Sequence, residues 1–233
     1  MVARLVLGLL LVGSLKSCVV YEYEHEFWLR VDGSGSVSVT GRPGLWAAFK
    51  GLGRAEDPDG KTAREAARDL FERSGLRVRR VTLTQRAGRP YLYLLADFAD
   101  LNRLSGSVAF PDLSVGLRPE NGSLVLEGSW RRPAPASANA ERDGLMAVRF
   151  HLPSKVYSHK NAALGVERGN IVSWRQDVAQ GLDGRPLDFG VTMDRRSILG
   201  STLALFVSAI ALAFGLLASV VWMVVRRGRK PNA

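Results

Sequence analysis

The chain has a single cysteine, Cys18, among its 233 residues. One cysteine excludes an intramolecular disulfide framework and a cysteine-rich zinc site. The three histidines, His25, His151 and His159, lie too far apart in the sequence to show a metal-ligand spacing. G-x-S-x-G, H-E-x-x-H, P-loop and dinucleotide-binding motifs are also missing from the sequence. We therefore expect no metal, no cofactor and no catalytic residue, and we interpret the chain as a protein other than an enzyme.

Acidic residues are missing at both ends of the chain. Residues 1–18 contain Arg4 and Lys16 without an acid, and residues 226–233 contain four basic residues without an acid. The intervening part has 26 basic and 22 acidic residues, so most of the net charge of +10 lies at the ends. A nucleic-acid-binding domain carries its basic excess on a folded surface. The distribution removes most of the support for nucleic acid as a partner, so we expect none, and it favours a membrane protein oriented by its basic ends.

Residues 1–18 have the pattern of a secretory signal peptide of the lipoprotein type. Arg4 precedes an uncharged apolar run from Leu5 to Leu15, which is too short to span a bilayer. The segment then ends in Leu15-Lys16-Ser17-Cys18, which is similar to a lipobox except for Lys16. We predict that Cys18 is lipidated; the alternatives are a free thiol or cleavage by the ordinary signal peptidase.

Residues 197–225 form a stretch of 29 residues without a charge. At about 1.5 Å per residue, such a helix exceeds a hydrocarbon core of about 30 Å. We predict a transmembrane helix over 197–225 and a basic cytoplasmic tail over 226–233. Residues 19–196 then form an extracytoplasmic domain at the bacterial cytoplasmic membrane. Within the span, Ala211, Gly215 and Ser219 recur every four residues, which indicates either helix–helix self-association or the ordinary composition of membrane helices.

The body is predicted to be α+β, with mostly antiparallel strands and one main amphipathic helix. Alternating residues over 21–40, around a glycine-rich turn, predict a β-hairpin. Its glutamates Glu22, Glu24 and Glu26 fall on one strand face, which is either solvated or a cation or acid–base site. The apolar spacing of residues 59–74 predicts the helix.

The rest of the body is predicted to be strands and loops. Residues 41–60, rich in glycine and proline, and residues 153–168 are expected to be irregular. Strands are expected over 76–85, 91–98, 108–117, 123–130 and 145–152, with 170–178 and 187–193 closing the body as a last hairpin.

The segment 41–60 also carries large apolar side chains. A glycine-rich loop with such side chains can form a ligand entrance, or it can tuck them under the loop as part of the core. For the first alternative we predict a set of residues that line a site for an acyl-like ligand: Leu45, Trp46, Phe49, Leu52, Tyr91, Tyr93 and Trp130.

The arrangement as a whole resembles the LppM family of bacterial envelope lipoproteins. The similar features are the signal ending at Cys18, the sequence YEYEHEFWLRVDGSGSVSVTG, the segment RGNIVSWRQDV over 168–178, and the single C-terminal span with its basic tail. The resemblance implies an extracytoplasmic α+β domain held at the membrane, with a role in binding envelope lipids. It assigns no ligand-binding residue.

Two functions follow as hypotheses. In the first, the chain is a membrane-anchored, non-catalytic binding module for a lipid or other amphiphile. In the second, it is a structural or assembly partner of another envelope protein. A deep apolar pocket would favour the first, and a flat surface would favour the second.

Overall fold

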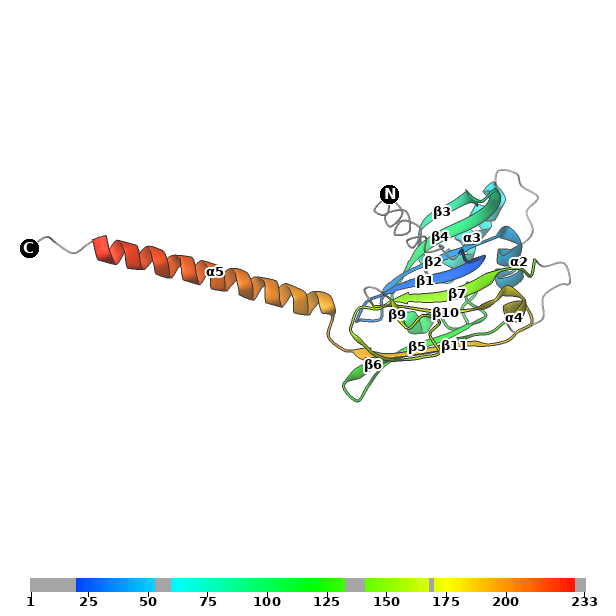
Figure 1. Cartoon of the computed structure of the whole chain (residues 1–233). Coiled ribbons are helices and arrows are strands. Elements are labelled where there is room, and N and C mark those ends of the chain that lie inside the picture. Colours follow the sequence, from blue (N-terminus) through cyan, green and yellow to red (C-terminus); the bar gives the residue numbers. More distant parts are fainter. Residues whose placement is uncertain (1–19, 53–59, 133–140, 168–169, 229–233) are drawn as a thin grey trace, which may run out of the picture.

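The computed structural model describes residues 20–52, 60–132, 141–167 and 170–228. Two β-sheets form most of the body, and one long helix projects away from it (Figure 1). The strands of the larger sheet, in the spatial order β3-β4-β2-β1-β7-β10-β9, are β1 (Tyr23–Leu29), β2 (Gly35–Gly41), β3 (Arg77–Arg86), β4 (Arg89–Phe98), β7 (Leu145–His151), β9 (Val166–Glu167) and β10 (Ile171–Asp177).

The smaller sheet has the spatial order β5-β6-β11-β8. Its strands are β5 (Leu113–Glu120), β6 (Ser123–Trp130), β8 (Val156–Lys160) and β11 (Leu187–Asp194). The helices are α2 (Pro43–Lys50), α3 (Lys61–Arg73), the short 3-10 helix η1 (Leu101–Arg103), α4 (Val178–Leu182) and α5 (Ile198–Gly228). Among the described strands, β1 and β7 form the one parallel pair. The predicted α+β class, with mostly antiparallel sheets, a main helix at α3 and a C-terminal apolar helix, is confirmed.

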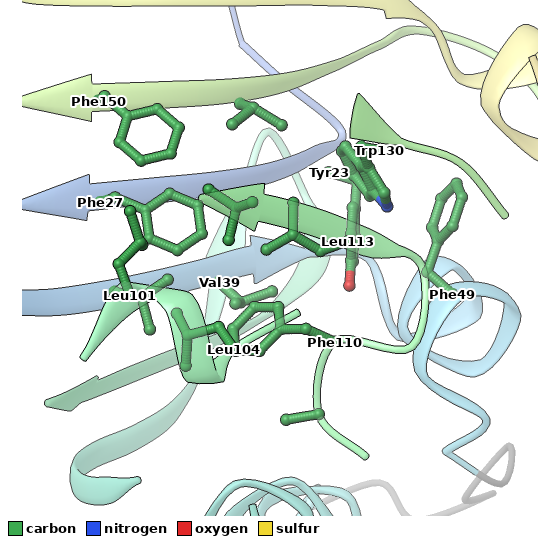
Figure 2. Packing of buried hydrophobic residues seen from close by; sticks show 14 of the residues in the cluster. Tyr23, Phe27, Val39, Phe49, Leu101, Leu104, Phe110, Leu113, Trp130 and Phe150 are labelled. Atoms are coloured by element: carbon green, nitrogen blue, oxygen red, sulfur yellow. The ribbon is translucent and has the colours of Figure 1, made fainter. Parts of the chain in front are cut away.

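The core lies on one face of the seven-stranded sheet, which we call the inner face. Period-two alternation on β1 turns Tyr23, His25 and Phe27 to this face, where they are fully buried. Phe27 stacks on Phe150 with ring centroids 4.6 Å apart, and Trp130 of the smaller sheet lies beside Tyr23 (Figure 2). The smaller sheet and the helices α2, α3, η1 and α4 all add side chains to this one cluster.

The prediction of a loop over residues 41–60 is wrong for its first half, where α2 forms. Pro43 occupies the first turn of α2, where its missing N–H costs nothing. Gly51 ends the helix in the left-handed conformation with φ 66°. The residues that indicate a loop therefore cap a helix, and the helical spacing of Leu45, Trp46 and Phe49 turns these side chains into the core.

The predicted last hairpin is also wrong. β10 pairs with β7 and β9 in the larger sheet, whereas β11 pairs with β6 and β8 in the smaller sheet. Both strands turn large apolar side chains into the space between the sheets, as with Trp174 and Phe189, whose rings lie 5.6 Å apart. Segment 153–168, expected to be irregular, supplies both β8 and β9.

One helix in the described part of the chain, spanning Thr202–Arg226 within α5, is long and apolar enough to cross a membrane. Its described side chains, such as Leu205 and Phe206, are exposed all round. A helix that is apolar on every side and uncovered by protein is suited to apolar surroundings such as a bilayer. Residues 1–19, with the predicted signal peptide and Cys18, lie outside the described residues.

Candidate functional site

The outer face of the seven-stranded sheet carries an ion-paired group of side chains. The smaller sheet and the described helices of the body pack on the inner face, so within the described ranges no element of the body covers the outer face. We call Glu24, Glu26, Trp28, Arg149 and His151 the outer-face cluster. Their charged side chains keep between 14% and 27% of their surface exposed, which places them between core and solvent.

Strand register brings the outer-face cluster together. β1 and β7 run parallel, so Glu26 lies directly beside Arg149 and Trp28 directly beside His151. Arg149 Nη1 lies 3.3 Å from Glu24 Oε1 and 3.4 Å from Glu26 Oε1. His151 Nε2 lies 2.7 Å from Glu26 Oε1, and its ring stacks on Trp28 with centroids 4.9 Å apart. The glutamates of β1 are therefore paired rather than simply solvated.

Arg149 and His151 could not be assigned to this site from the sequence. More than 120 positions separate them from Glu26, and alternation along β7 indicates only that both share one strand face. The parallel pairing of β1 with β7 supplies the missing contact.

The two carboxyl groups of the cluster have different proton affinities. Burial raises the pKa of Glu24, and this effect outweighs the opposing charge of Arg149. Burial also acts to raise the pKa of Glu26, but the hydrogen bond to His151 and the charge of Arg149 overcome it and lower this pKa. Of the two carboxyl groups, Glu24 therefore takes up a proton more readily than Glu26. In the described ranges, no three His, Cys, Asp or Glu side chains form a group suited to a metal ion.

Tyr91 and Tyr93 lie on the same outer face, on β4. The Tyr91 hydroxyl donates a hydrogen bond to Glu22, and burial together with this bond raises the pKa of Tyr91 to about 12. Tyr93 is half-buried, and the short side chain of Thr40 on β2 pairs opposite it. The outer face therefore combines aromatic surface with hydroxyl, carboxylate and guanidinium groups.

The other predicted ligand residues lie on the inner face, in the core. Leu45, Trp46, Phe49, Leu52 and Trp130 keep 0%, 1%, 4%, 9% and 1% of their surface exposed. The structure therefore divides the predicted set between opposite faces of one sheet. As a ligand site the inner group remains a prediction, and a ligand there would have to displace packed side chains.

An ion pair is buried next to that inner group. Lys50 Nζ lies 3.4 Å from Asp112 Oδ1, and the two side chains keep 0% and 1% of their surface exposed. Trp130 donates its indole N–H to the other oxygen of Asp112. Burial lowers the pKa of Lys50, and the charge of Asp112 opposes this shift. This ion pair was not predicted from the sequence. The helical spacing of Lys50 from Trp46 is the signal that could have placed Lys50 on the buried face of α2.

Asp112 also lies beside a surface hollow of about 520 Å³. The hollow has mostly small or polar lining residues, which are Ser105, Gly106, Pro111, Asp112, Leu113, Ser114, Ser129 and Arg131. Its polar lining suits water or a small polar group rather than an acyl chain.

The free energy of unfolding is expected to decrease as the pH is lowered, because His25 is buried in its neutral form. Burial, and secondly the charge of Lys50, lowers the pKa of His25 well below its ordinary value of 6.5. The unfolded chain then binds a proton that the folded chain does not. This group's contribution to stability is complete above the unfolded pKa and decreases below it, by about 1.4 kcal/mol per pH unit. Denaturant unfolding of the chain and of a His25→Phe variant between pH 5 and 7 measures the difference. Equal pH slopes for the two proteins would contradict the assignment.

Comparison with known proteins gives limited matches. No protein-family model matches the sequence, and no curated protein matches it. A solved structure that matches is the NMR structure of the folded domain of LppM from Mycobacterium tuberculosis. The match has 15% sequence identity and a TM-score of 0.42, and it covers 78% of this chain and 94% of that domain. The chain is thus similar to that domain at low identity, and membership of a family does not follow.

Proposed function

We propose that this chain is a membrane-anchored protein of the bacterial cell envelope, whose body acts outside the cytoplasm as a non-catalytic binding module for a lipid or other amphiphile. The observation that carries the proposal is the uncovered outer face of the seven-stranded sheet with its outer-face cluster. We propose this face, rather than the apolar residues of the core, as the place where the ligand binds.

The position of the proposed membrane helix α5 supports the proposal that the ligand comes from the membrane. β11 ends at Asp194 and the apolar part of α5 begins at Thr202. The intervening residues extend at most about 25 Å, so the end of β11 stays close to the bilayer. The basic residues after Val225 favour a cytoplasmic C-terminus. Lipidation of Cys18, measured as incorporation of labelled fatty acid, would add a second anchor.

The chemistry of the outer face fits a ligand with both apolar and polar parts. Trp28, Tyr93 and Leu95 offer half-buried apolar surface. The carboxylates of Glu24 and Glu26 offer hydrogen-bond acceptors, and Arg149 holds both of them in place. A rigid array of this kind orients a polar group without having to be ordered on binding, which favours affinity.

Photo-crosslinking tests the proposed surface. The full chain is placed in nanodiscs that contain a phospholipid with a photoreactive headgroup, and the crosslinked peptides are identified by mass spectrometry. We expect crosslinks on the peptides that contain Trp28 and Tyr93, and we expect them to fall several-fold in a Trp28→Ala/Tyr93→Ala variant.

Crosslinks to α5 give an internal reference, because the variant leaves the span unchanged. A matched control, Tyr157→Ala, removes an exposed aromatic side chain of the smaller sheet and is expected to change nothing. Crosslinks confined to α5 in the parent chain would refute binding at the outer face.

A second candidate function is that of a structural or assembly partner for another envelope protein. It is favoured by β3, a long strand at one edge of the larger sheet, which among the described strands pairs with β4 alone. A partner recovered with the intact chain but without any bound lipid would support this function over the first.

A further inference from the structure

The net positive charge of the body comes from one structural unit. Residues 60–98, which form α3, β3 and β4, contain nine Lys or Arg and four Asp or Glu. The rest of residues 19–196 contains 17 basic and 18 acidic residues. The whole basic excess of the body therefore lies on α3, β3 and β4.

This basic unit includes an open sheet edge. β3 is ten residues long and stands at the end of the strand order, next to β4 alone. Its register with β4 shifts between Val78 and Arg80 and is regular from Arg80 to Arg86. One row of backbone N–H and C=O groups along this regular part has no strand to pair with in the described part of the chain, which makes it a template for an added strand.

The arginines of β3 differ in whether they already form an ion pair with an acidic side chain. Arg77 and Arg79 both form ion pairs with Asp97, at 2.6 Å and 2.7 Å. Arg86 lies over the ring of Tyr91 at 5.2 Å, and Arg89 at the start of β4 reaches Glu22 only at 3.9 Å. Arg80 is exposed, and it has no ion pair with the acids of the described residues. The regular part of the edge therefore keeps guanidinium groups available to an outside anion.

We propose that β3 binds an extended acidic segment of a partner protein, which adds to the seven-stranded sheet as a further strand. Backbone hydrogen bonds to the free edge supply a sequence-independent contribution. The arginines on β3 and at the start of β4 select acidic side chains and repel basic ones. This interaction uses the free edge of β3, whereas the proposed amphiphile would bind over β1, β7 and β4. Arg80 lies opposite Leu95 of β4 and so borders both surfaces.

The charge of the edge distinguishes between possible occupants. A second copy of this chain would bring two arginine-rich edges together, which like-charge repulsion disfavours. A bilayer surface is disfavoured because it has no backbone groups that could pair with the free N–H and C=O row of β3. An acidic strand satisfies both the backbone edge and the charge.

Peptide binding to the full chain in nanodiscs of neutral lipid tests the proposal. The probe is a short fluorescent peptide that alternates Glu with Val, and its affinity is measured by anisotropy. We expect saturable binding that weakens at least about tenfold, or about 1.4 kcal/mol, in an Arg80→Glu/Arg86→Glu variant. An Arg103→Glu/Arg118→Glu variant, which makes the same charge change on η1 and β5, is expected to bind as the parent does.

Two further arms separate strand addition from simple charge attraction. A peptide N-methylated at alternate residues keeps its charge but cannot donate along one edge, and it is expected not to bind. Amide hydrogen exchange of β3 is expected to slow when the unmodified peptide binds. The proposal is overturned if the N-methylated peptide or a Lys–Val peptide binds equally well, or if the Arg80→Glu/Arg86→Glu variant keeps the parent's affinity while its circular dichroism shows it folded.

Discussion

Replacing Lys50 by methionine is expected to lower the free energy of unfolding by about 3–5 kcal/mol, because it leaves the Asp112 carboxylate buried without its cation. Asp112 keeps 4% of its surface exposed, and the indole N–H of Trp130 would remain as its hydrogen-bond donor. Denaturant unfolding of the full chain in detergent, followed by tryptophan fluorescence, measures the loss.

A double variant separates the loss of the pair from the loss of packing. In Lys50→Met/Asp112→Leu both charges are gone, and the destabilisation is expected to be smaller than the sum of those of the two single variants. A Lys50→Met variant with a stability within about 1 kcal/mol of the parent would show that the pair is solvated rather than buried.

Truncating Trp46 to alanine is expected to cost about 3–5 kcal/mol of stability, as for a buried tryptophan. The side chain is 1% exposed, and its indole N–H donates to the Leu92 carbonyl at 3.1 Å. Its ring also packs edge-on against Tyr23 at 6.2 Å between centroids. The variant therefore loses packing and leaves a buried carbonyl without its donor.

The same variant tests whether Trp46 contacts a ligand. If Trp46 belongs only to the core, Trp46→Ala lowers the midpoint of unfolding while the folded fraction binds an amphiphile as the parent does. A variant that keeps the parent's stability and loses binding would instead restore the inner apolar group as the ligand site. Trp46→Phe, which keeps most of the ring volume, is the milder control.

Local sequence patterns predicted the secondary structure correctly where a segment's own residues determine it. The alternation over 21–40 predicts the β1–β2 hairpin, and the apolar stripe over 59–74 predicts α3, which spans Lys61–Arg73. The strand expected over 123–130 coincides with β6. In each of these segments the apolar period and the turn or capping residues agree.

Local sequence patterns did not predict the features that depend on contacts between distant parts of the chain. The strand period of β10 and β11 is visible in the sequence, but it does not tell which sheet each strand joins. Glycine and proline around α2 have two structural uses, as loop residues and as helix caps, and the packing of Trp46 decides between them. The outer-face cluster depends on parallel pairing between β1 and β7, which are more than a hundred residues apart. Of the predicted ligand residues, the sequence could not show that Tyr91 and Tyr93 face away from the other five.

The most direct test of the account is a comparison of the lipids that co-purify with the full chain and with its Trp28→Ala/Tyr93→Ala variant. Both proteins carry the same α5, so lipids bound non-specifically to the span are the same in each preparation. Quantitative lipid mass spectrometry is expected to find one lipid class enriched with the parent chain and reduced to background with the folded variant. The same lipids in the same amounts in both preparations would contradict amphiphile binding at the outer face of the seven-stranded sheet.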